Sequence, residues 1–430
     1  MTHFGILCPP STGHLNPMTA LGRELQRRGH CVTLFGIADA KSKALAAGLN
    51  FCMIGESQHP YGATAQSLAK LGQLSGFSAL QYTMILMKEG INLLLSEAPQ
   101  AIKAASVEAL LVDQLTVEGE TIAEFLQIPF ITVCNALPVN QEASIPPFFT
   151  SWSHNTALWA RLRNRAAYLL TRQITKPLTQ VLDIYRQKWS LPLYSQAPHK
   201  DSFSQLAQLS QLPQELDFPR QSLPKCFHFT GPYQDPTGRE PTPFPYEKLT
   251  GQRLIYASLG TIQNQLLEIF HTIASACIGL DVQLVISLGG SSGSELIQGL
   301  PGSPLVVNYA PQLELLKKTT LTVTHAGLNT VLESLSNSIP MLAIPIANDQ
   351  PAVAARLAWA GAGEVVPLSQ LTVPRLQTSI QQLMTEDSYK KNASRLQTAI
   401  RRAGGVSRAA DIVEQVINTG KPVFSHLEDK

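Results

Sequence analysis

The sequence predicts an α/β protein made of two doubly wound, parallel-sheet domains that face a cleft. Its 430 residues are too many for one ordinary core and suit two domains of roughly 200 residues each. In both halves, short apolar runs with strand character alternate with helical patterns. Between the halves, a proline-rich segment makes regular structure hard to sustain.

The alternation of strand and helix begins at the start of the chain. Two βαβ units are predicted, the first from 4–8, 17–28 and 31–36 and the second from 109–113, 117–126 and 129–135. Each strand candidate is short and apolar, as in a sheet that is buried on both faces. We expect residues 1–232 to form an N-terminal Rossmann-like domain, within which residues 137–228 are an elaboration with proline-rich turns and one long helix, 156–189.

The second half repeats this pattern after a linker at residues 233–250. Strand candidates are 254–258, 283–288, 305–309, 321–325, 341–345 and 364–366. They predict a C-terminal Rossmann-like domain over residues 251–404. The remaining residues, 405–430, read as a helix that could pack back on the first domain.

The composition argues against several classes of protein. A 44% apolar and 15% charged chain indicates a large core, and a net charge of +2 gives no field that would attract nucleic acid. Possible ligands do not cluster, so we expect no metal and no other cofactor. The six cysteines lack CxxC spacing and read as buried thiols. Without a signal peptide or an apolar run of roughly 18–20 residues, a cytoplasmic protein is expected.

The first candidate for chemistry is His14, between the first strand and the first helix. Asn16 is a natural N-cap and Pro17 suits the first helical position, so His14 should lie at the carboxyl end of a strand, where open α/β sheets bind ligands. Asp113 also ends a strand and could orient the imidazole. The pair suits general-base catalysis near neutral pH. The alternatives are a histidine that only bonds its own turn and an acid that only caps a helix.

A second polar group follows the strand at 321–325. His325, Gly327 and the free amides of the next helix would face one point, which suits a diphosphate. The side chains of Asn329 and Thr330 could add hydrogen bonds. Glu333 could bind ribose hydroxyls, or it could close a capping box with Thr330.

Two shorter patterns are less specific when taken alone. Ser258, Gly260 and Thr261 end the first strand of the second half, where small residues and a hydroxyl could meet phosphate. Asp349 and Gln350 follow a later strand, and an adjacent acid and amide can bind several sugar hydroxyls.

Taken together, the motifs resemble the donor-binding signature of the UDP-glycosyltransferases. The matching residues are Tyr309-Ala310-Pro311-Gln312, His325-Ala326-Gly327-Leu328-Asn329-Thr330, Glu333, Pro340 and Asp349-Gln350, in family order and near-family spacing. Gly13, His14, Asn16, Pro17 and Asp113 extend the resemblance into the first half. Within the family, the stretches 325–333 and 348–356 look most like the bacterial zeaxanthin (carotenoid) glucosyltransferases.

The resemblance implies a GT-B fold and an inverting transfer of glucose from UDP-glucose, with the acceptor on the N-terminal domain and the donor on the C-terminal one. His14 would be the base and Asp113 its partner. By the same resemblance, Tyr309 would stack on uracil, Gln312 and Glu333 would hold ribose, and Asp349 and Gln350 would read the sugar. The diphosphate would be held by Thr261, His325, Asn329 and Thr330. The full set of expected donor contacts is Gly13, Ser258, Gly260, Thr261, Tyr309, Ala310, Gln312, His325, Gly327, Asn329, Thr330, Glu333, Asp349 and Gln350.

Three departures from the family pattern stand out. Plant members usually carry tryptophan where Tyr309 stands, and the stretch from Gln312 to His325 is about two residues shorter than theirs. Ser338 takes the place of a common glycine. These changes bear on uracil stacking and on one turn.

The acceptor is expected to be an apolar small molecule, such as a carotenoid or a phenolic compound. Aromatic and methionine residues in 61–95 and in 146–149 could line an acceptor channel or simply pack a core. The stretch 161–188 holds seven basic residues against Asp183. It could contact anionic lipid peripherally, or it could be a solvated helix face.

Other functions were weighed against this one. An NAD-dependent oxidoreductase is disfavoured because no G-x-G-x-x-G follows the first strand. A non-catalytic sugar-nucleotide-binding module would keep the donor residues but has no reason to keep both His14 and Asp113. Transfer of another nucleotide sugar to a polyketide-type acceptor stays open.

Overall fold

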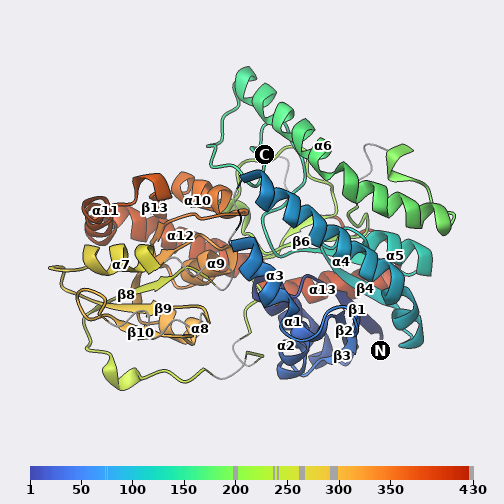
Figure 1. The fold of residues 1–430 in the computed structure, drawn as a ribbon, viewed down its shortest axis with the longest axis horizontal. Coiled ribbons are helices and arrows are strands. Elements are labelled where there is room, and N and C mark those ends of the chain that lie inside the picture. The colour runs from blue at the N-terminus through green and yellow to red at the C-terminus, as the bar shows by residue number, and fades with distance from the viewer. Residues whose placement is uncertain are drawn as a thin grey trace.

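The computed structural model contains two parallel β-sheets, each flanked by helices (Figure 1). It describes residues 1–72, 74, 76–196, 202–235, 238–239, 242–260, 267–290 and 299–425. The strand order is β3-β2-β1-β4-β5-β6-β7 in the first sheet and β10-β9-β8-β11-β12-β13 in the second. The prediction of two doubly wound parallel-sheet domains is confirmed.

The N-terminal sheet is formed by β1 (His3–Leu7), β2 (Cys31–Gly36), β3 (Asn50–Met53), β4 (Ala109–Asp113), β5 (Phe130–Cys134), β6 (Gln208–Ser210) and β7 (Phe227–Phe229). Its helices are α1 (Thr12–Arg27), α2 (Lys41–Ala46), α3 (Ala63–Gly72), α4 (Gly76–Ala104), α5 (Gly119–Leu126) and α6 (Leu158–Lys188). The two longest, α4 and α6, pack against each other along one side of the domain (Figure 1).

The centre of this sheet is buried on both faces. In β1, Ile6 pairs with Leu34 on one side and with Leu111 on the other. Successive strand residues point to opposite faces, so Ile6 packs with α1 while Leu7 packs with α4 and α5. Both faces therefore need apolar side chains, which is why the strand reads as a continuous apolar run.

The C-terminal domain repeats this arrangement. Its strands are β8 (Arg253–Ser258), β9 (Val282–Ser287), β10 (Leu305–Val307), β11 (Thr319–Thr324), β12 (Met341–Ala343) and β13 (Gly363–Val365). Its helices are α7 (Leu267–Ala276), α8 (Gln312–Leu316), α9 (Leu328–Ser336), α10 (Gln350–Trp359), α11 (Val373–Thr385) and α12 (Asp387–Ala403). Ile255 and Tyr256 of β8 pack in different core clusters, one on each face of the sheet.

The helix α13 (Gly405–Thr419) follows the C-terminal domain in sequence but packs on the N-terminal one (Figure 1). Ile412 and Val413 are fully buried in the core formed with β1 and α1. At the end of α1, Arg28 forms ion pairs with Asp411 at 2.7 Å and with Glu414 at 2.6 Å. The chain thus crosses between the domains twice, through the linker and again at α13.

The structure differs from the sequence predictions at two points. The stretch 137–228, expected as an elaboration, supplies β6 and β7 to the sheet. These strands have three residues each, and β6 carries the buried polar residues Gln208 and Ser210, so no apolar run marked it. The helix α1 begins at Thr12, so the prediction that Asn16 caps it and Pro17 opens it was wrong.

No helix in the described part of the chain is long and apolar enough to cross a membrane.

We expect Ile412→Ala to destabilise the N-terminal domain by about 2–5 kcal/mol, because removal of buried methyl groups leaves a cavity. Hydrogen exchange measured by mass spectrometry should then accelerate in β1 and α1. Ile380→Ala, at an equally buried position of the C-terminal core, is the matched control and should accelerate exchange in that domain. If Ile412→Ala left β1 and α1 unaffected, α13 would not stabilise the N-terminal domain.

Candidate active site

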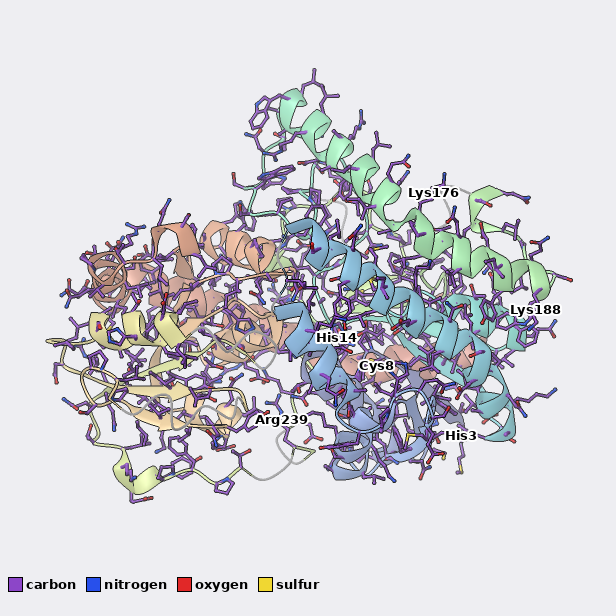
Figure 2. The ribbon with its side chains drawn as sticks, in the orientation of Figure 1. His3, Cys8, His14, Lys176, Lys188 and Arg239 are labelled. Atoms are coloured by element: carbon purple, nitrogen blue, oxygen red, sulfur yellow. The ribbon has the colours of Figure 1, made fainter. Side chains whose placement is uncertain are left out.

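His14 lies near the middle of the molecule, where the two domains meet (Figure 2). It is in the first turn of α1, immediately after β1, and Asp113 is the last residue of the neighbouring parallel strand β4. The carboxyl ends of adjacent parallel strands meet at one edge of a sheet, which brings the two side chains together. The Nδ1 atom of His14 donates a hydrogen bond of 2.7 Å to Oδ2 of Asp113.

Asp113 is fully buried, and hydrogen bonds satisfy its carboxylate. Its Oδ1 accepts from the backbone N–H of Leu115 at 2.8 Å, and Oδ2 also accepts from Nδ2 of Asn135 at 2.6 Å. Asn135 directly follows β5 and in turn accepts a hydrogen bond from Gln211. The carboxylate is therefore fixed by three neighbouring segments of the sheet edge, which leaves it little freedom to turn away from His14.

The environment of His14 sets both its tautomer and its pKa. Burial alone lowers the pKa of the imidazole, but the charge and hydrogen bond of Asp113, with a smaller effect of the Asp349 charge, outweigh it and raise the pKa above its ordinary value. Because the carboxylate accepts from Nδ1, the proton of the neutral ring is placed on Nδ1. The Nε2 atom is then the ring nitrogen that can accept a proton.

The C-terminal domain reaches the same point through Asn329. The Nδ2 atom of Asn329 donates to the carbonyl of Gly13 at 2.8 Å. Inside a helix that carbonyl would accept the N–H of the fourth residue along, but this residue is Pro17, which has no N–H. The proline inside α1 therefore frees a carbonyl for a contact between the domains.

His325 packs between two glycines. A Cβ atom at Gly260 or at Gly327 would come within 2.6 Å of the imidazole Nε2, so neither position accepts a larger residue without movement. Gly260 also has a φ of +80°, which favours glycine. Burial lowers the pKa of His325 to about 4, although a hydrogen bond with the Ser258 backbone opposes this, so the ring is neutral at pH 7.

The helix α9 begins with Gly327 as its N-cap, and its first N–H groups follow directly after His325. Glu333 does not close a capping box with Thr330, so that alternative was wrong. Its carboxylate accepts a 2.5 Å hydrogen bond from Nε2 of Gln312 and pairs with Arg239 of the linker. Gln312 also accepts from the hydroxyl of Tyr256 at 3.0 Å and donates to Thr330 at 3.4 Å. These contacts place Gln312, Thr330 and Glu333 in one cluster.

The remaining predicted donor residues have mixed surroundings. Tyr309 is half exposed, and its ring lies against Gly290, where a Cβ atom would clash with it. Ala310 packs against the core cluster that contains Leu254 and Tyr256 of β8. Thr261 lies outside the described residues. The serine that replaces a common glycine, Ser338, adopts a φ of +57°, the left-handed conformation that glycine favours.

Asp349 and Gln350 stand at the start of α10. Asp349 is partly buried, and desolvation raises the pKa of its carboxyl, while its Oδ2 lies 3.5 Å from the backbone N–H of Leu137. The charge of Asp349, which lies across the domain boundary, also helps to raise the pKa of His14. The Oε1 atom of Gln350 accepts from the backbone N–H groups of Ile346 and Ala347, in the loop that precedes α10. The side-chain NH₂ group of Gln350 has no partner among the described residues.

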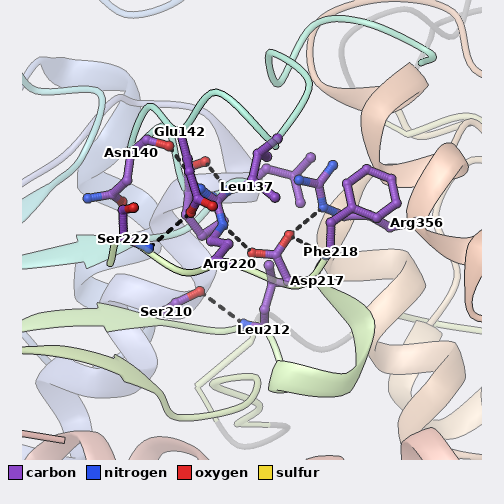
Figure 3. A network of polar contacts seen from close by, with 12 residues as sticks. Leu137, Asn140, Glu142, Ser210, Leu212, Asp217, Phe218, Arg220, Ser222 and Arg356 are labelled. Atoms are coloured by element: carbon purple, nitrogen blue, oxygen red, sulfur yellow. Dashed lines mark hydrogen bonds and ion pairs between the residues drawn. The ribbon is translucent and has the colours of Figure 1, made fainter. Parts of the chain in front are cut away.

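Sequence reasoning missed a buried ion cluster that joins the domains (Figure 3). Asp217 of the N-terminal domain pairs with Arg220 at 2.6 Å and with Arg356 of α10 at 2.7 Å, and all three side chains are buried. Arg220 also donates to the carbonyls of Pro138 and Asn140. Burial raises the pKa of Asp217, but the two arginines outweigh it, so the net pKa is lowered.

No local sequence pattern indicated this cluster, because Asp217 and Arg356 are far apart in the chain. Arg356 lies in α10, about two turns after the N-cap residue Asp349, and Arg220 holds the segment that follows Leu137. The cluster therefore positions α10 against the N-terminal domain beside the site. Arg239 was missed for a different reason, since it lies in the linker and only the fold brings it to Glu333.

Within the described ranges, no group of three or more His, Cys, Asp or Glu side chains is close enough to hold a metal ion.

His14 on one Rossmann-like domain and the N-terminus of α9 on the other meet at the domain boundary, in a two-domain fold of the GT-B class. Comparison with known proteins then gives the family. The model for "UDP-glucoronosyl and UDP-glucosyl transferase" matches residues 63–403, and the chain belongs to this UDP-glycosyltransferase family. It is accordingly a glycosyltransferase that uses a nucleotide sugar.

Three relatives illustrate the similarity. The zeaxanthin glucosyltransferase of Pantoea ananas is 35% identical over 431 residues, which cover 99% of this chain and 98% of that protein. The zeaxanthin glucosyltransferase of Pseudescherichia vulneris is 31% identical, covering 97% and 98%. Among solved structures, the calicheamicin glycosyltransferase CalG4 superposes with a TM-score of 0.73 at 19% identity, covering 98% of this chain and 100% of that chain.

We expect Arg356→Met to lower the free energy of unfolding by about 3–5 kcal/mol, because it breaks a buried ion pair and leaves the Asp217 charge paired with Arg220 alone. Urea denaturation at pH 7 measures this change. Arg375→Met, at an exposed position of α11, is the control and should change stability by less than about 0.5 kcal/mol. In a double-mutant cycle with Asp217→Asn, additive effects would show that the two residues are not coupled.

Proposed function

We propose that this protein is an inverting glucosyltransferase that moves glucose from UDP-glucose to a hydroxyl of an apolar small molecule, with a carotenoid diol such as zeaxanthin as the first candidate. The observation that carries the proposal is the hydrogen bond between His14 and a fully buried Asp113 at the boundary of the two domains. The names of the two relatives in Pantoea ananas and Pseudescherichia vulneris support the choice of donor and acceptor.

In the proposed reaction, Nε2 of His14 accepts the proton of the acceptor hydroxyl as the oxygen attacks the anomeric carbon. The bond between that carbon and the diphosphate oxygen breaks, and UDP leaves with the electron pair. A single displacement of this kind inverts the anomeric configuration. Asp113 stabilises the imidazolium that forms, because its carboxylate already accepts from Nδ1.

The donor is proposed to lie along the start of α9. The helix N-terminus favours negative charge, and His325, Asn329, Thr330 and Thr261 would bind the diphosphate there. Tyr309 would stack on uracil. Gly13, Ser258, Gly260, Ala310 and Gly327 would line the donor through their backbones. Asp349 and the free amide of Gln350 would bind the sugar hydroxyls, and no metal is proposed to take part.

Gln312 and Glu333 are proposed to hold the ribose. Their hydrogen bond already aligns the Glu333 carboxylate, and Arg239 pairs with the same group. The ribose hydroxyls must therefore share this carboxylate with Arg239 or displace the guanidinium from it. Closure of the domains about the linker would bring the donor toward His14 and exclude water.

Peripheral contact with a membrane, by an otherwise cytoplasmic protein, is part of this proposal. An acceptor of the carotenoid type partitions into lipid, so an enzyme that acts on it gains access to its substrate at a bilayer surface.

We expect His14→Ala to lower acceptor-dependent release of UDP from UDP-glucose by about 10²- to 10⁴-fold, the typical contribution of a general base. The control is His271→Ala, an exposed position on α7, which should retain full activity. The acceptor panel should run from zeaxanthin-like diols to small phenols. UDP binding without turnover on any acceptor would favour a non-catalytic binding module, and undiminished release by His14→Ala would remove the base from its role.

The pH dependence offers a separate test of the pair. A neutral imidazole is the base, so the rate should rise as pH rises through the pKa of His14. Asp113 raises that pKa, so Asp113→Asn should move the acidic limb of the pH–rate profile to lower pH and also lower the maximal rate. An acidic limb that stays in place would mean that another group controls it.

We expect Glu333→Gln to raise KM for UDP-glucose by about 10- to 100-fold, because hydrogen bonds to a charged acceptor contribute about 1.5–3 kcal/mol. With 2′-deoxy-UDP-glucose, which lacks one of the ribose hydroxyls, the same substitution should raise KM much less. Glu314→Gln, which removes an exposed carboxylate on α8, is the control. Equal increases with both donors would contradict a ribose contact.

A further inference from the structure

The outer face of α6 is defined here by five exposed apolar residues: Leu158, Trp159, Leu162, Leu169 and Leu170. Each of these side chains is between 54% and 72% exposed. Their spacing of four, seven and eleven residues places them on one side of the helix, since each residue turns the helix by about 100°. The buried residues of α6 lie on the opposite side. The face is therefore an apolar stripe whose five side chains are each more than half exposed.

Basic residues surround this stripe. Arg165, Arg172 and Lys176 are exposed on the same helix, and the sequence contains no aspartate or glutamate from residue 143 to residue 182. Lys176 and Lys188 lie along α6 at the margin of the molecule (Figure 2). A surface of positive charge with exposed leucines is complementary to anionic lipid, whose headgroups attract the cations while the acyl chains take up the apolar side chains.

The position of α6 leaves its outer face accessible to a membrane. The helix lies on the outside of the N-terminal domain, and its first half extends beyond the rest of the fold (Figure 1). Its second half is anchored by Leu178, Val181 and Leu182, which are buried against α4. Near its start, the guanidinium of Arg163 stacks on the rings of Trp152 at 4.0 Å and Trp159 at 5.2 Å. An indole held in this way is suited to the boundary between headgroups and acyl chains.

We propose that the outer face of α6 is the surface by which this protein docks on an anionic membrane, with the helix lying in the plane of the headgroups. The assignment rests on the membrane contact proposed above and names the element, the face and the lipid charge. Docking through α6 brings the N-terminal domain, which holds His14, to the bilayer, while α4 and α6 form the side of the domain nearest to lipid.

The experiment is co-flotation of the full chain with vesicles of neutral phosphatidylcholine, alone or mixed with phosphatidylglycerol. The wild type should float with the anionic vesicles, and less so as salt rises from about 0.05 M to about 0.5 M, because the Debye length shortens. Leu162→Glu/Leu169→Glu should weaken this partitioning at least about tenfold. The matched control is Ile278→Glu/Phe424→Glu, which changes two apolar residues that are 50% and 59% exposed elsewhere, and it should float like the wild type.

A charge variant separates the electrostatic contribution. Arg165→Gln/Lys176→Gln should weaken binding to anionic vesicles by more than about tenfold, since each basic residue near such a surface contributes about one kcal/mol. Release of UDP with a water-soluble phenolic acceptor should be unchanged in both α6 variants, which shows that they fold and keep the site.

Each remaining outcome overturns a particular step. Equal flotation of the wild type and Leu162→Glu/Leu169→Glu would assign the membrane contact to another surface. No flotation of the wild type would overturn the membrane contact itself, while leaving glucosyl transfer to be judged by UDP release. If light scattering showed a wild-type dimer that the same double variant dissociates, without flotation of either, the outer face of α6 would be a contact between two copies.

Discussion

Asp113 is fully buried, and the arrangement of the site follows from the hydrogen bonds that this acid needs. An acid without partners in such a place would be costly, so the carboxylate must find donors from neighbouring segments. It finds them in His14 after β1, in the N–H of Leu115 after β4 and in Asn135 after β5. Three strand ends are thereby held at one edge of the sheet. The same contacts fix the imidazole, so the group that packs the sheet edge also orients the histidine.

The second domain is held to this edge by contacts of different kinds. Asn329 bonds a carbonyl that Pro17 leaves free, and Arg356 pairs with the buried Asp217. The helix α13 adds an apolar contact with α1 and β1 of the N-terminal domain. The buried pair and the apolar contact would be expensive to break, whereas a single exposed hydrogen bond is cheap. Motion of the domains about the linker should therefore open the interface first near Asn329, where the proposed donor binds, while the Arg356 pair stays closed.

Local patterns in the sequence were enough to predict the architecture and the two main polar groups. Strands such as β2 and β4 are buried on both faces, and their apolar runs predicted their limits to the residue. The strand β6 was not predicted, because it carries buried polar side chains in place of an apolar run. Their partners can lie far away in sequence, as when Gln208 accepts a hydrogen bond from Asn140. The cluster of Asp217 and Arg356 was not predicted for the same reason, since no local sequence pattern indicates an ion pair between residues 139 positions apart. The start of α1 was misplaced because a proline is usually read as the first helical residue, whereas here it lies within the helix.

The two histidines of the site show how surroundings divide one residue type into two roles. His14 is bonded to Asp113, and the effect of this acid on its pKa, with the charge of Asp349, exceeds that of burial. His325 lies between glycines, where burial dominates and keeps the ring neutral at pH 7. A neutral ring can donate a hydrogen bond to a diphosphate but cannot neutralise its charge. In the proposed reaction the negative charge that develops on the leaving group would therefore be stabilised chiefly by the N–H groups at the start of α9, beside which Gly260 and Gly327 leave room for the imidazole of His325.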